Sequence, residues 1–267
     1  MTSRSLFDLS DRAALVTGGS RGIGRFLAEG LAQAGAHVFV ASRSAERCDE
    51  AAAAITAGGG RATAVPADVS DPEAAEALVA NVLRQTERLD ILVNDAARAW
   101  SAPTMEFPLD GWDRVFALNV RGAFWLCRLV APHMKERGGG SIINVSSLSA
   151  AFGASEEEQP IAAYPASKGA LEAMTRDLAV KWAPHRIRVN AIAPGPFDTD
   201  MFAHIRNDPE ALARHDRQVP LGRPGGADDM RGVGVFLASD ASAFVTGSIL
   251  RVDGGVAAVY PVRKNPI

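Results

Sequence analysis

The sequence predicts an α/β protein, built as one doubly wound parallel sheet of about seven strands with helices on both faces. Three observations predict this class. Short runs rich in Val, Ile and Leu alternate with helical stretches along the whole chain. These runs are continuously apolar, as strands covered on both faces are. No repeat, low-complexity tract or interdomain linker interrupts the pattern, so we expect residues 1–267 to form a single domain.

The composition argues against several classes of binding partner. The chain has 267 residues, of which 47% are hydrophobic and 22% charged, and its net charge is −3. Such a chain has no basic excess for binding nucleic acid. The first residues lack the apolar core of a signal peptide, and no run approaches a membrane span, so we expect a cytoplasmic protein without a membrane partner. Cys48, Cys127 and the five histidines have no metal-ligand spacing, so we expect neither a metal site nor a disulfide.

The first half of the chain holds four expected strands and the helices between them. Ser70 or Asp71 is placed to cap the third helix, with Pro72 in its first turn. The strands are expected at 13–17, 37–41, 62–68 and 89–94, and the helices at 22–34, over the Ala-rich stretch that ends at 58–60, and from 70 onward.

The second half begins with a long helix and contains one irregular segment. Helices are expected at 111–134, 162–183 and 228–239, and strands within 138–147, at 186–194 and within 248–255. The segment 196–225 is rich in Pro, Gly and charge, which suits a mobile lid over a substrate. Met201, Phe202 and Ile205 would form an apolar strip on this lid, although a packing helix explains the strip equally well.

A glycine-rich segment, TGGSRGIG, follows the first expected strand and opens the first helix. Gly18, Gly22 and Gly24 would let the chain turn tightly and let backbone N–H groups approach a pyrophosphate at the helix N-terminus. A glycine cluster by itself also serves plain turns. Its place between strand and helix favours nucleotide binding.

Further motifs follow in order: ADV at 67–69, NDAA at 94–97, LNV at 118–120, INVSS at 143–147, YPASK at 164–168, NAIAPGPFDT at 190–199 and VDGG at 252–255. Together with TGGSRGIG they make the chain resemble the short-chain dehydrogenase/reductase family over essentially its whole length. The resemblance implies a Rossmann-type fold, a nicotinamide cofactor and hydride transfer to or from a carbonyl or secondary alcohol.

Tyr164 and Lys168 lie four residues apart and therefore on one helix face. A core Tyr beside a solvated Lys would explain the pair taken alone. The resemblance instead implies that Tyr164 is the general acid, and a neighbouring ammonium is expected to lower the pKa of its phenol from about 10. It also implies that Lys168 binds the nicotinamide ribose, that Ser147, with Ser146 as its rival, orients the substrate, and that Asn119 helps to hold a water.

The turn after the second strand bears on cofactor choice. NAD-binding chains place an acidic residue there, whereas this sequence has Ser42 and Arg43, with Arg21 in the glycine segment. Two guanidinium groups and a hydroxyl suit a 2′-phosphate, which favours NADP over NAD. Either Arg could instead pair at the surface with Glu46 or Asp49. The full set of expected cofactor-binding residues is Gly18, Ser20, Arg21, Gly22, Ile23, Gly24, Ser42, Arg43, Asp68, Val69, Asn94, Ala96, Tyr164, Lys168, Pro194, Gly195, Phe197 and Thr199.

The chain departs from the family pattern at two places. The family's N-N-A-G motif is NDAA here, so Asp95 is expected to disturb structural hydrogen bonds and Ala97 to crowd the cofactor. Sixteen residues separate Ser147 from Tyr164, which implies a longer loop, containing SEEEQP, beside the substrate mouth.

Within the family the chain resembles 3-oxoacyl thioester reductases, and HIRNDPEALARHDRQVPLGR is similar to a branch associated with rhamnolipid-type β-hydroxyacyl metabolism. Two alternatives stay open: a sugar, polyol or steroid alcohol dehydrogenase, and a non-catalytic nucleotide-sensing protein.

The helices 111–134 and 163–183 carry more apolar residues than one sheet face requires, and the last residues add an apolar tail. We therefore expect a homotetramer, or failing that a dimer, with packing inside one subunit as the competing interpretation. The apolar residues are Phe116, Phe124, Trp125, Leu129, Met174 and Trp182.

Overall fold

The computed structural model describes residues 6–200 and 208–259, and its centre is a seven-stranded parallel sheet. The strand order is β3-β2-β1-β4-β5-β6-β7, so the direction of winding reverses between β1 and β4. Ligands of such sheets bind at the carboxyl ends of the strands beside this reversal. The strands are β1 (Ala13–Thr17), β2 (His37–Ala41), β3 (Arg61–Ala64), β4 (Ile91–Asn94), β5 (Gly140–Val145), β6 (Ile187–Pro194) and β7 (Ile249–Val252).

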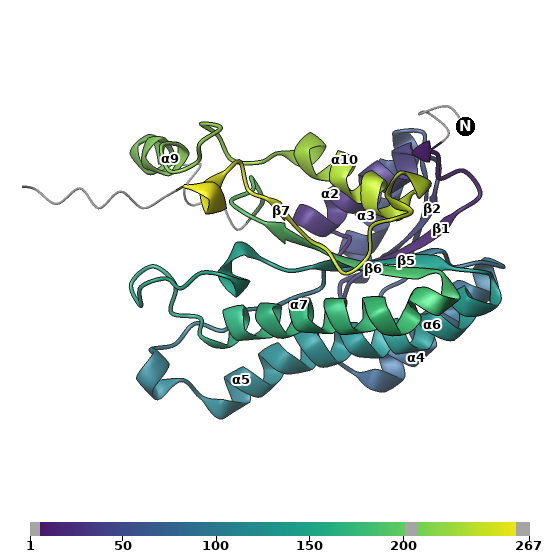
Figure 1. Ribbon diagram of the computed structural model, residues 1–267, viewed down its shortest axis with the longest axis horizontal. Helices are drawn as coiled ribbons and strands as arrows, with labels where there is room; N and C mark the ends of the chain where they lie inside the picture. Colours follow the sequence, from purple (N-terminus) through teal and green to yellow (C-terminus); the bar gives the residue numbers. More distant parts are fainter. Residues whose placement is uncertain (1–5, 201–207, 260–267) are drawn as a thin grey trace, which may run out of the picture.

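Helices cover both faces of the sheet (Figure 1). One face carries α2 (Gly22–Gln33), α3 (Ala45–Ala57) and α10 (Ala227–Ala238). The other face carries α4 (Pro72–Gln85), α5 (Leu109–Phe116), α6 (Ala123–Glu136) and α7 (Ala163–Trp182). Each face of the sheet buries its own apolar cluster. Successive side chains of β1 point to opposite faces, so Leu15 belongs to one cluster and Val16 to the other. This is why the strands are apolar at every position.

Local sequence signals account for several element boundaries. Asp71 caps α4 by accepting a hydrogen bond from the Glu73 amide at 3.1 Å, and Pro72 fills the first helical position, as predicted. β3 ends at Ala64, earlier than predicted, although the Val65 and Ala67 amides beyond it still donate to the Val40 and Ser42 carbonyl oxygens at 2.9 Å. β4 begins only at Ile91, because the side chain of Asp90 takes the Ala13 amide at 2.9 Å.

The expected long helix 111–134 is longer and less regular than predicted. It starts at Leu109 in α5, widens into a π-helical turn at Ala117–Gly122, and continues as α6. Gly122 fits this turn against the loop after β3, since a Cβ there would lie 2.5 Å from the Val69 carbonyl oxygen. The whole run Leu109–Glu136 is long and apolar enough to cross a membrane by length and composition, contrary to the expectation from sequence. Half of its most apolar window is buried in the protein, as in the core helix of a soluble domain.

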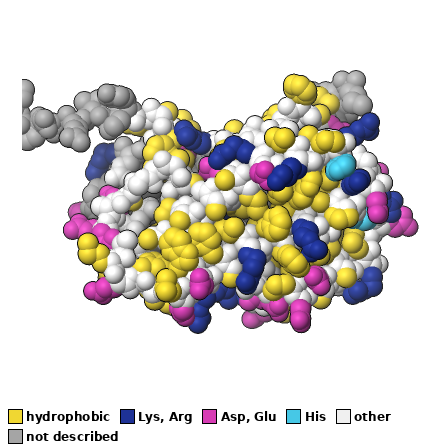
Figure 2. All heavy atoms as spheres, turned by 60° about the horizontal axis from the view of Figure 1, so that its bottom comes forward, with side chains coloured by type: hydrophobic (Ala, Val, Ile, Leu, Met, Phe, Trp, Pro, Cys, Tyr) yellow, Lys and Arg dark blue, Asp and Glu magenta, His cyan; other side chains and the backbone are white. Residues whose placement is uncertain are grey.

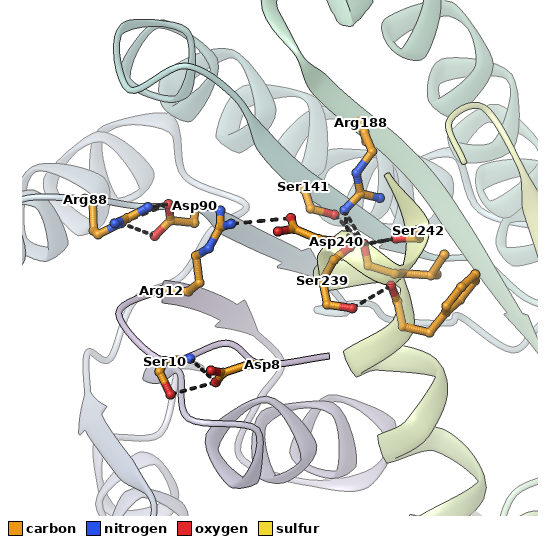
Figure 3. Close-up of polar contacts among 12 residues, drawn as sticks. Asp8, Ser10, Arg12, Arg88, Asp90, Ser141, Arg188, Ser239, Asp240 and Ser242 are labelled. Atoms are coloured by element: carbon orange, nitrogen blue, oxygen red, sulfur yellow. Dashed lines mark hydrogen bonds and ion pairs between the residues drawn. The ribbon is translucent and has the colours of Figure 1, made fainter. Parts of the chain in front are cut away.

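A polar network joins the elements at the amino ends of the strands, opposite the expected ligand edge (Figure 3). The Asp90 carboxylate, only 4% exposed, accepts hydrogen bonds from Arg88 at 2.6 Å and from the Ala13 amide. Arg188 and Ser141 both donate to the Leu237 carbonyl oxygen at 2.8 Å. These contacts fix β1, β4, β5 and β6 to the end of α10, away from the ligand-binding edge.

The segment predicted as a lid is described in part. It begins beside Gly225, with which Asp198 and Pro196 exchange backbone hydrogen bonds of 2.8 and 2.9 Å, and it contains the helix α9 (Pro209–Asp216). Met201, Phe202 and Ile205 lie outside the described residues. Cys48 and Cys127 are both free and buried.

Candidate active site

A pocket of about 640 Å³ lies at the carboxyl ends of β1, β2, β4, β5 and β6. It is the place that the strand order predicts for a ligand. The predicted site residues that line it are Gly18, Ser20, Arg21, Gly22, Ile23, Ser42, Arg43, Asp68, Val69, Ala96, Ser147, Tyr164, Lys168, Pro194, Gly195, Phe197 and Thr199.

The glycine turn between β1 and α2 forms one wall of the pocket. Gly18 and Gly22 have φ of +70° and +54°, a conformation that favours glycine. A Cβ at Gly18 would lie 2.8 Å from the Ala96 nitrogen, and one at Gly24 would lie 2.5 Å from the Gly18 carbonyl oxygen. The turn therefore needs glycine at these positions, and it leaves the N-terminus of α2 facing the pocket, where backbone N–H groups can bind a phosphate.

The end of the pocket beyond β2 is cationic. Arg21 and Arg43 line it, and so does Arg47 in the first turn of α3, which sequence reasoning missed although it stands only four residues after Arg43. Neither Glu46 nor Asp49 contributes to the lining. This arrangement fits a phosphate group on the adenosine ribose.

Asp68 lies on the same side of the pocket. Burial by itself would raise the pKa of Asp68, but hydrogen bonds from Ser70, at 2.6 and 3.0 Å, and the charges of Arg43 and Arg98 bring the pKa below its usual value. Asp68 is therefore an ionised acceptor at neutral pH.

Tyr164, Ser147 and Lys168 meet at the other end of the pocket. The Ser147 hydroxyl is hydrogen-bonded to the Tyr164 hydroxyl. The Lys168 ammonium, with the residue only 3% exposed, donates to the Val145 carbonyl oxygen at 2.6 Å and lies 5.5 Å from the centre of the Tyr164 ring. Ser146, the rival of Ser147, instead donates to Glu172 at 2.9 Å. Tyr164 therefore pairs with Ser147.

Asn119 does not line the pocket but is linked to Tyr164 through hydrogen bonds beneath it. It is 2% exposed and sits in the π-helical turn. Its side-chain oxygen accepts from the Arg98 amide at 2.9 Å, and its side-chain nitrogen donates to the Arg98 carbonyl and to Ser167, each at 2.9 Å. Ser167 in turn donates to the Tyr164 carbonyl oxygen at 2.7 Å. Asn119 thus positions the backbone of α7 at Tyr164.

The net effect of the protein on Tyr164 is a raised pKa, which corrects the expectation from the Tyr–Lys spacing. Burial raises the pKa of Tyr164 to about 12; the hydrogen bond from Ser147 opposes this rise, and the charge of Asp95 adds to it. Burial also lowers the pKa of Lys168 to about 8, against the effect of Asp95. Desolvation is therefore the largest cause of the pKa shift of both residues.

Two other predicted cofactor residues lie outside the pocket lining. Gly24 lies behind the glycine turn, and Asn94 points into the core. The Asn94 amide donates to Asn144 at 2.9 Å and to the Cys127 sulfur at 3.3 Å, and burial raises the pKa of Cys127 to about 12. The Asn94 side chain therefore joins β4 to β5 and α6, and the place of Asn94 beside the cofactor stays a prediction.

Several lining residues escaped prediction. Gln159 comes from the long loop after Ser147, and Asp200 from the start of the lid segment; only the loop length hinted at the former. Asp95 and Ala97, noted as departures from the family pattern, both line the pocket. Among the described residues, no group of three or more His, Cys, Asp or Glu side chains could hold a metal ion.

The comparison with known proteins agrees with this geometry. A family model described as enoyl-(acyl carrier protein) reductase matches residues 18–257. The chain belongs to the short-chain dehydrogenase/reductase family. The match begins at the glycine turn and runs through Tyr164 and Lys168 to the end of the sheet.

Relatives in this family carry different activities. The chain is 39% identical to the rhamnolipids biosynthesis 3-oxoacyl-[acyl-carrier-protein] reductase of Pseudomonas aeruginosa, covering 93% of this chain and 97% of that protein. It is 40% identical to the gluconate 5-dehydrogenase of Gluconobacter oxydans, covering 96% and 98%. The solved Pseudomonas aeruginosa RhlG/NADP active-site complex is 39% identical, with a TM-score of 0.88 over 94% of this chain and 98% of that one. The family, the fold and the class of oxidoreductase are thus shared, while the relatives differ in substrate.

Proposed function

We propose that this short-chain dehydrogenase/reductase uses NADP(H) to interconvert a carbonyl and a secondary alcohol, and that its substrate is a 3-oxoacyl thioester. The observation that carries the proposal is the meeting of Tyr164, Ser147 and Lys168 in the same pocket as the glycine turn. A non-catalytic nucleotide-binding protein would have no need of this group.

The residues of the pocket would hold the dinucleotide along its whole length. The glycine turn and the N-terminus of α2 would hold the pyrophosphate. Arg21, Ser42 and Arg43 would hold the 2′-phosphate, which supports NADP over NAD, as does the NADP complex of the relative. Asp68 and Val69 would contact the adenine, and the remaining predicted residues would contact the nicotinamide end, namely Tyr164, Lys168, Pro194, Gly195, Phe197 and Thr199.

When bound, the reduced cofactor supplies the hydride. Ser147 and Tyr164 would hold the carbonyl oxygen of the substrate between their hydroxyls, and Tyr164 would donate its proton to that oxygen as negative charge develops there. Lys168 would keep a positive charge beside the phenolate that remains. Asn119 would keep α7 in place during the cycle through its bonds to Arg98 and Ser167.

A sugar or polyol dehydrogenase is the second candidate. Gln159, with an uncharged amide, lines the pocket together with Ser147 and Tyr164, and a hydroxyl-rich substrate would use such a hydrogen-bonding group. The 40% identity to a gluconate 5-dehydrogenase favours the same interpretation.

A turnover panel separates these functions. Purified protein would be assayed with NADPH and NADH against 3-oxoacyl thioesters, keto sugar acids, sugars and steroid ketones, with Tyr164→Phe as the control for background. A kcat/KM with a 3-oxoacyl thioester at least about tenfold above the others supports the first candidate, and the reverse ratio supports the second. Absence of turnover on all substrates, with NADPH still bound, would favour the nucleotide-binding protein.

We also propose a cytoplasmic homotetramer and a lid function for 196–225. The backbone pairing of Pro196 and Asp198 with Gly225 supports a lid, because it holds together the two ends of the segment while α9 lies between them. A groove lined by Phe116, Val120, Phe124 and Met174, on the face formed by α5, α6 and α7, supports assembly.

A further inference from the structure

Asp95 is a charged residue at the floor of the pocket, in the first position after β4. The residue is half-buried. Its carboxylate lies against the glycine turn, because a Cβ at Gly24 or Gly18 would lie 2.5 or 2.8 Å from the Asp95 Oδ2 atom. The carboxylate also accepts a hydrogen bond from the Gly24 amide. The departure from the family pattern therefore does not leave the turn without a partner.

Three polar groups interact electrostatically with this carboxylate. Arg21 does so from the glycine turn, and Lys168 and Tyr164 do so from α7. The Lys168 ammonium donates its hydrogen bond to the neutral carbonyl of Val145, so Asp95 is the acidic group whose charge acts on this buried ammonium. The same negative charge opposes ionisation of Tyr164.

We propose that Asp95 is a positioning residue of the active site, whose carboxylate holds the glycine turn and adds a negative charge beside Lys168 and Tyr164. The inference rests on the proposed function only in calling Tyr164 the proton donor. Reduction of a carbonyl consumes the proton of Tyr164, so a group that favours the protonated phenol favours this direction over alcohol oxidation.

An asparagine at position 95 separates the two roles of the carboxylate. Its side-chain oxygen can still accept the hydrogen bond from the Gly24 amide, but it carries no charge. Burial raises the pKa of Asp95 to about 6, so at pH 8 and above the wild-type side chain is ionised and the comparison is one of charge against no charge.

The test titrates Tyr164 without any substrate. The chain has two tyrosines, Tyr164 and Tyr260, so in a Tyr260→Phe background tyrosinate absorbance reports Tyr164 alone. The absorbance would be followed from pH 8 up to the pH at which near-ultraviolet circular dichroism shows loss of the fold. We expect Asp95→Asn to increase the tyrosinate fraction at a given pH at least about threefold, because the opposing charge is gone.

Asp49→Asn on the exposed side of α3 is the matched control, since it removes one negative charge far from Tyr164 and should leave the fraction unchanged. If Asp95→Asn does not fold, Asp95→Ser replaces it in the titration, and the same increase in tyrosinate fraction is expected. An equal tyrosinate fraction in the folded Asp95 variant and in its background would overturn the proposal.

Kinetics give a second readout. The acid limb of the pH profile for alcohol oxidation should move to lower pH in Asp95→Asn, whereas a purely structural role would lower kcat without moving the limb. If the protein turns over none of the substrates tested, the proposed function fails while the tyrosinate titration still decides the role of Asp95.

Discussion

The ammonium nitrogen of Lys168 lies 2.6 Å from the carbonyl oxygen of Val145, the last residue of β5. This bond ties α7 to the strand that also delivers Ser147, two residues further on. Tyr164 and Ser147 therefore meet because one side chain fixes the helix to the strand end. The arrangement makes Lys168 a structural part of the site as well as a source of charge.

Replacement of Tyr164 by Phe removes the proton donor and keeps the ring. We expect kcat to fall by about 10²- to 10⁴-fold, the usual contribution of general acid catalysis, while NADPH affinity changes less than about twofold. Steady-state kinetics and a fluorescence titration with NADPH measure both quantities. A folded variant with near-normal turnover would rule out the assignment.

Replacement of Arg43 by Asp removes one cation from the end of the pocket and adds a repelling charge. We expect KM for NADPH to rise at least about tenfold while KM for NADH changes little, because only NADPH carries the 2′-phosphate. Arg84→Asp, on an exposed turn of α4 outside the pocket, is the control. A wild-type preference for NADH would contradict the prediction.

The stability of the protein should depend on Asp95 through pH. Burial raises the pKa of Asp95 from 3.8 to about 6, so the folded protein binds more protons than the unfolded chain between these values. Stability is then lost as the pH rises through this window. We expect Asp95→Asn to gain stability relative to wild type between pH 4 and pH 7, on the order of 2 kcal/mol. Urea unfolding at four pH values measures the difference, and a pH-independent difference would contradict it.

Gly30 lies where α2 crosses α10, and a Cβ there would lie 2.8 Å from the Cα of Arg231. We expect Gly30→Ala to destabilise the protein by about 1–3 kcal/mol, because backbone must move to admit the methyl group. Gly232 on α10 is the matched control: it is exposed, and a Cβ there would meet nothing within 4 Å. Gly232→Ala should stabilise by up to about 1 kcal/mol. Equal effects of the two substitutions would show that the crossing is not tight.

The helices α5, α6 and α7 present an apolar groove to solvent. Figure 2, in which the face below the sheet in Figure 1 comes forward, shows hydrophobic side chains gathered across this face. Phe116, Val120, Phe124 and Met174 line the groove, and Phe124 is 40% exposed. Trp125, Leu129 and Trp182, expected on the same surface, are partly buried and pack against the core of their own subunit, as Met174 also does.

We expect the wild-type protein to be a tetramer, or a dimer, across this groove, and Phe124→Glu to lower its mass. Light scattering coupled to size-exclusion chromatography measures the mass, and Ala57→Glu, exposed on α3 over the other sheet face, serves as the control. A wild-type mass near 28.1 kDa at micromolar concentration would refute the assembly.

The sequence predicted the order of strands and helices well because both faces of the sheet are covered and every strand is therefore apolar. It located the family, the NADP-type cationic pocket and the cluster of Tyr164, Ser147 and Lys168, since these depend on short motifs at strand ends. The NADP prediction is supported by the NADP-bound relative.

Features that depend on tertiary contacts could not be predicted from the sequence. The direction of the pKa shift of Tyr164 follows from burial, which spacing on a helix does not report. The side chain of Asn94 turns away from the pocket because Asn144 lies beside it on the neighbouring strand. The contact of Asp95 with the glycine turn likewise joins segments that are far apart in the chain.

The π-helical turn at Ala117–Gly122 acts as a phase shift between α5 and α6. Each residue of an α-helix advances the side chains by about 100°, and a π turn accommodates one residue more than the α repeat. Deletion of a single residue here would restore a regular helix and rotate α5 by that angle relative to α6. Asn119 would then leave Ser167, and Phe116 would leave the groove that it shares with Phe124. A change of chain length in this helix therefore disturbs the support of Tyr164 and the outer apolar surface at the same time. Point substitution is the tolerated way to vary either one.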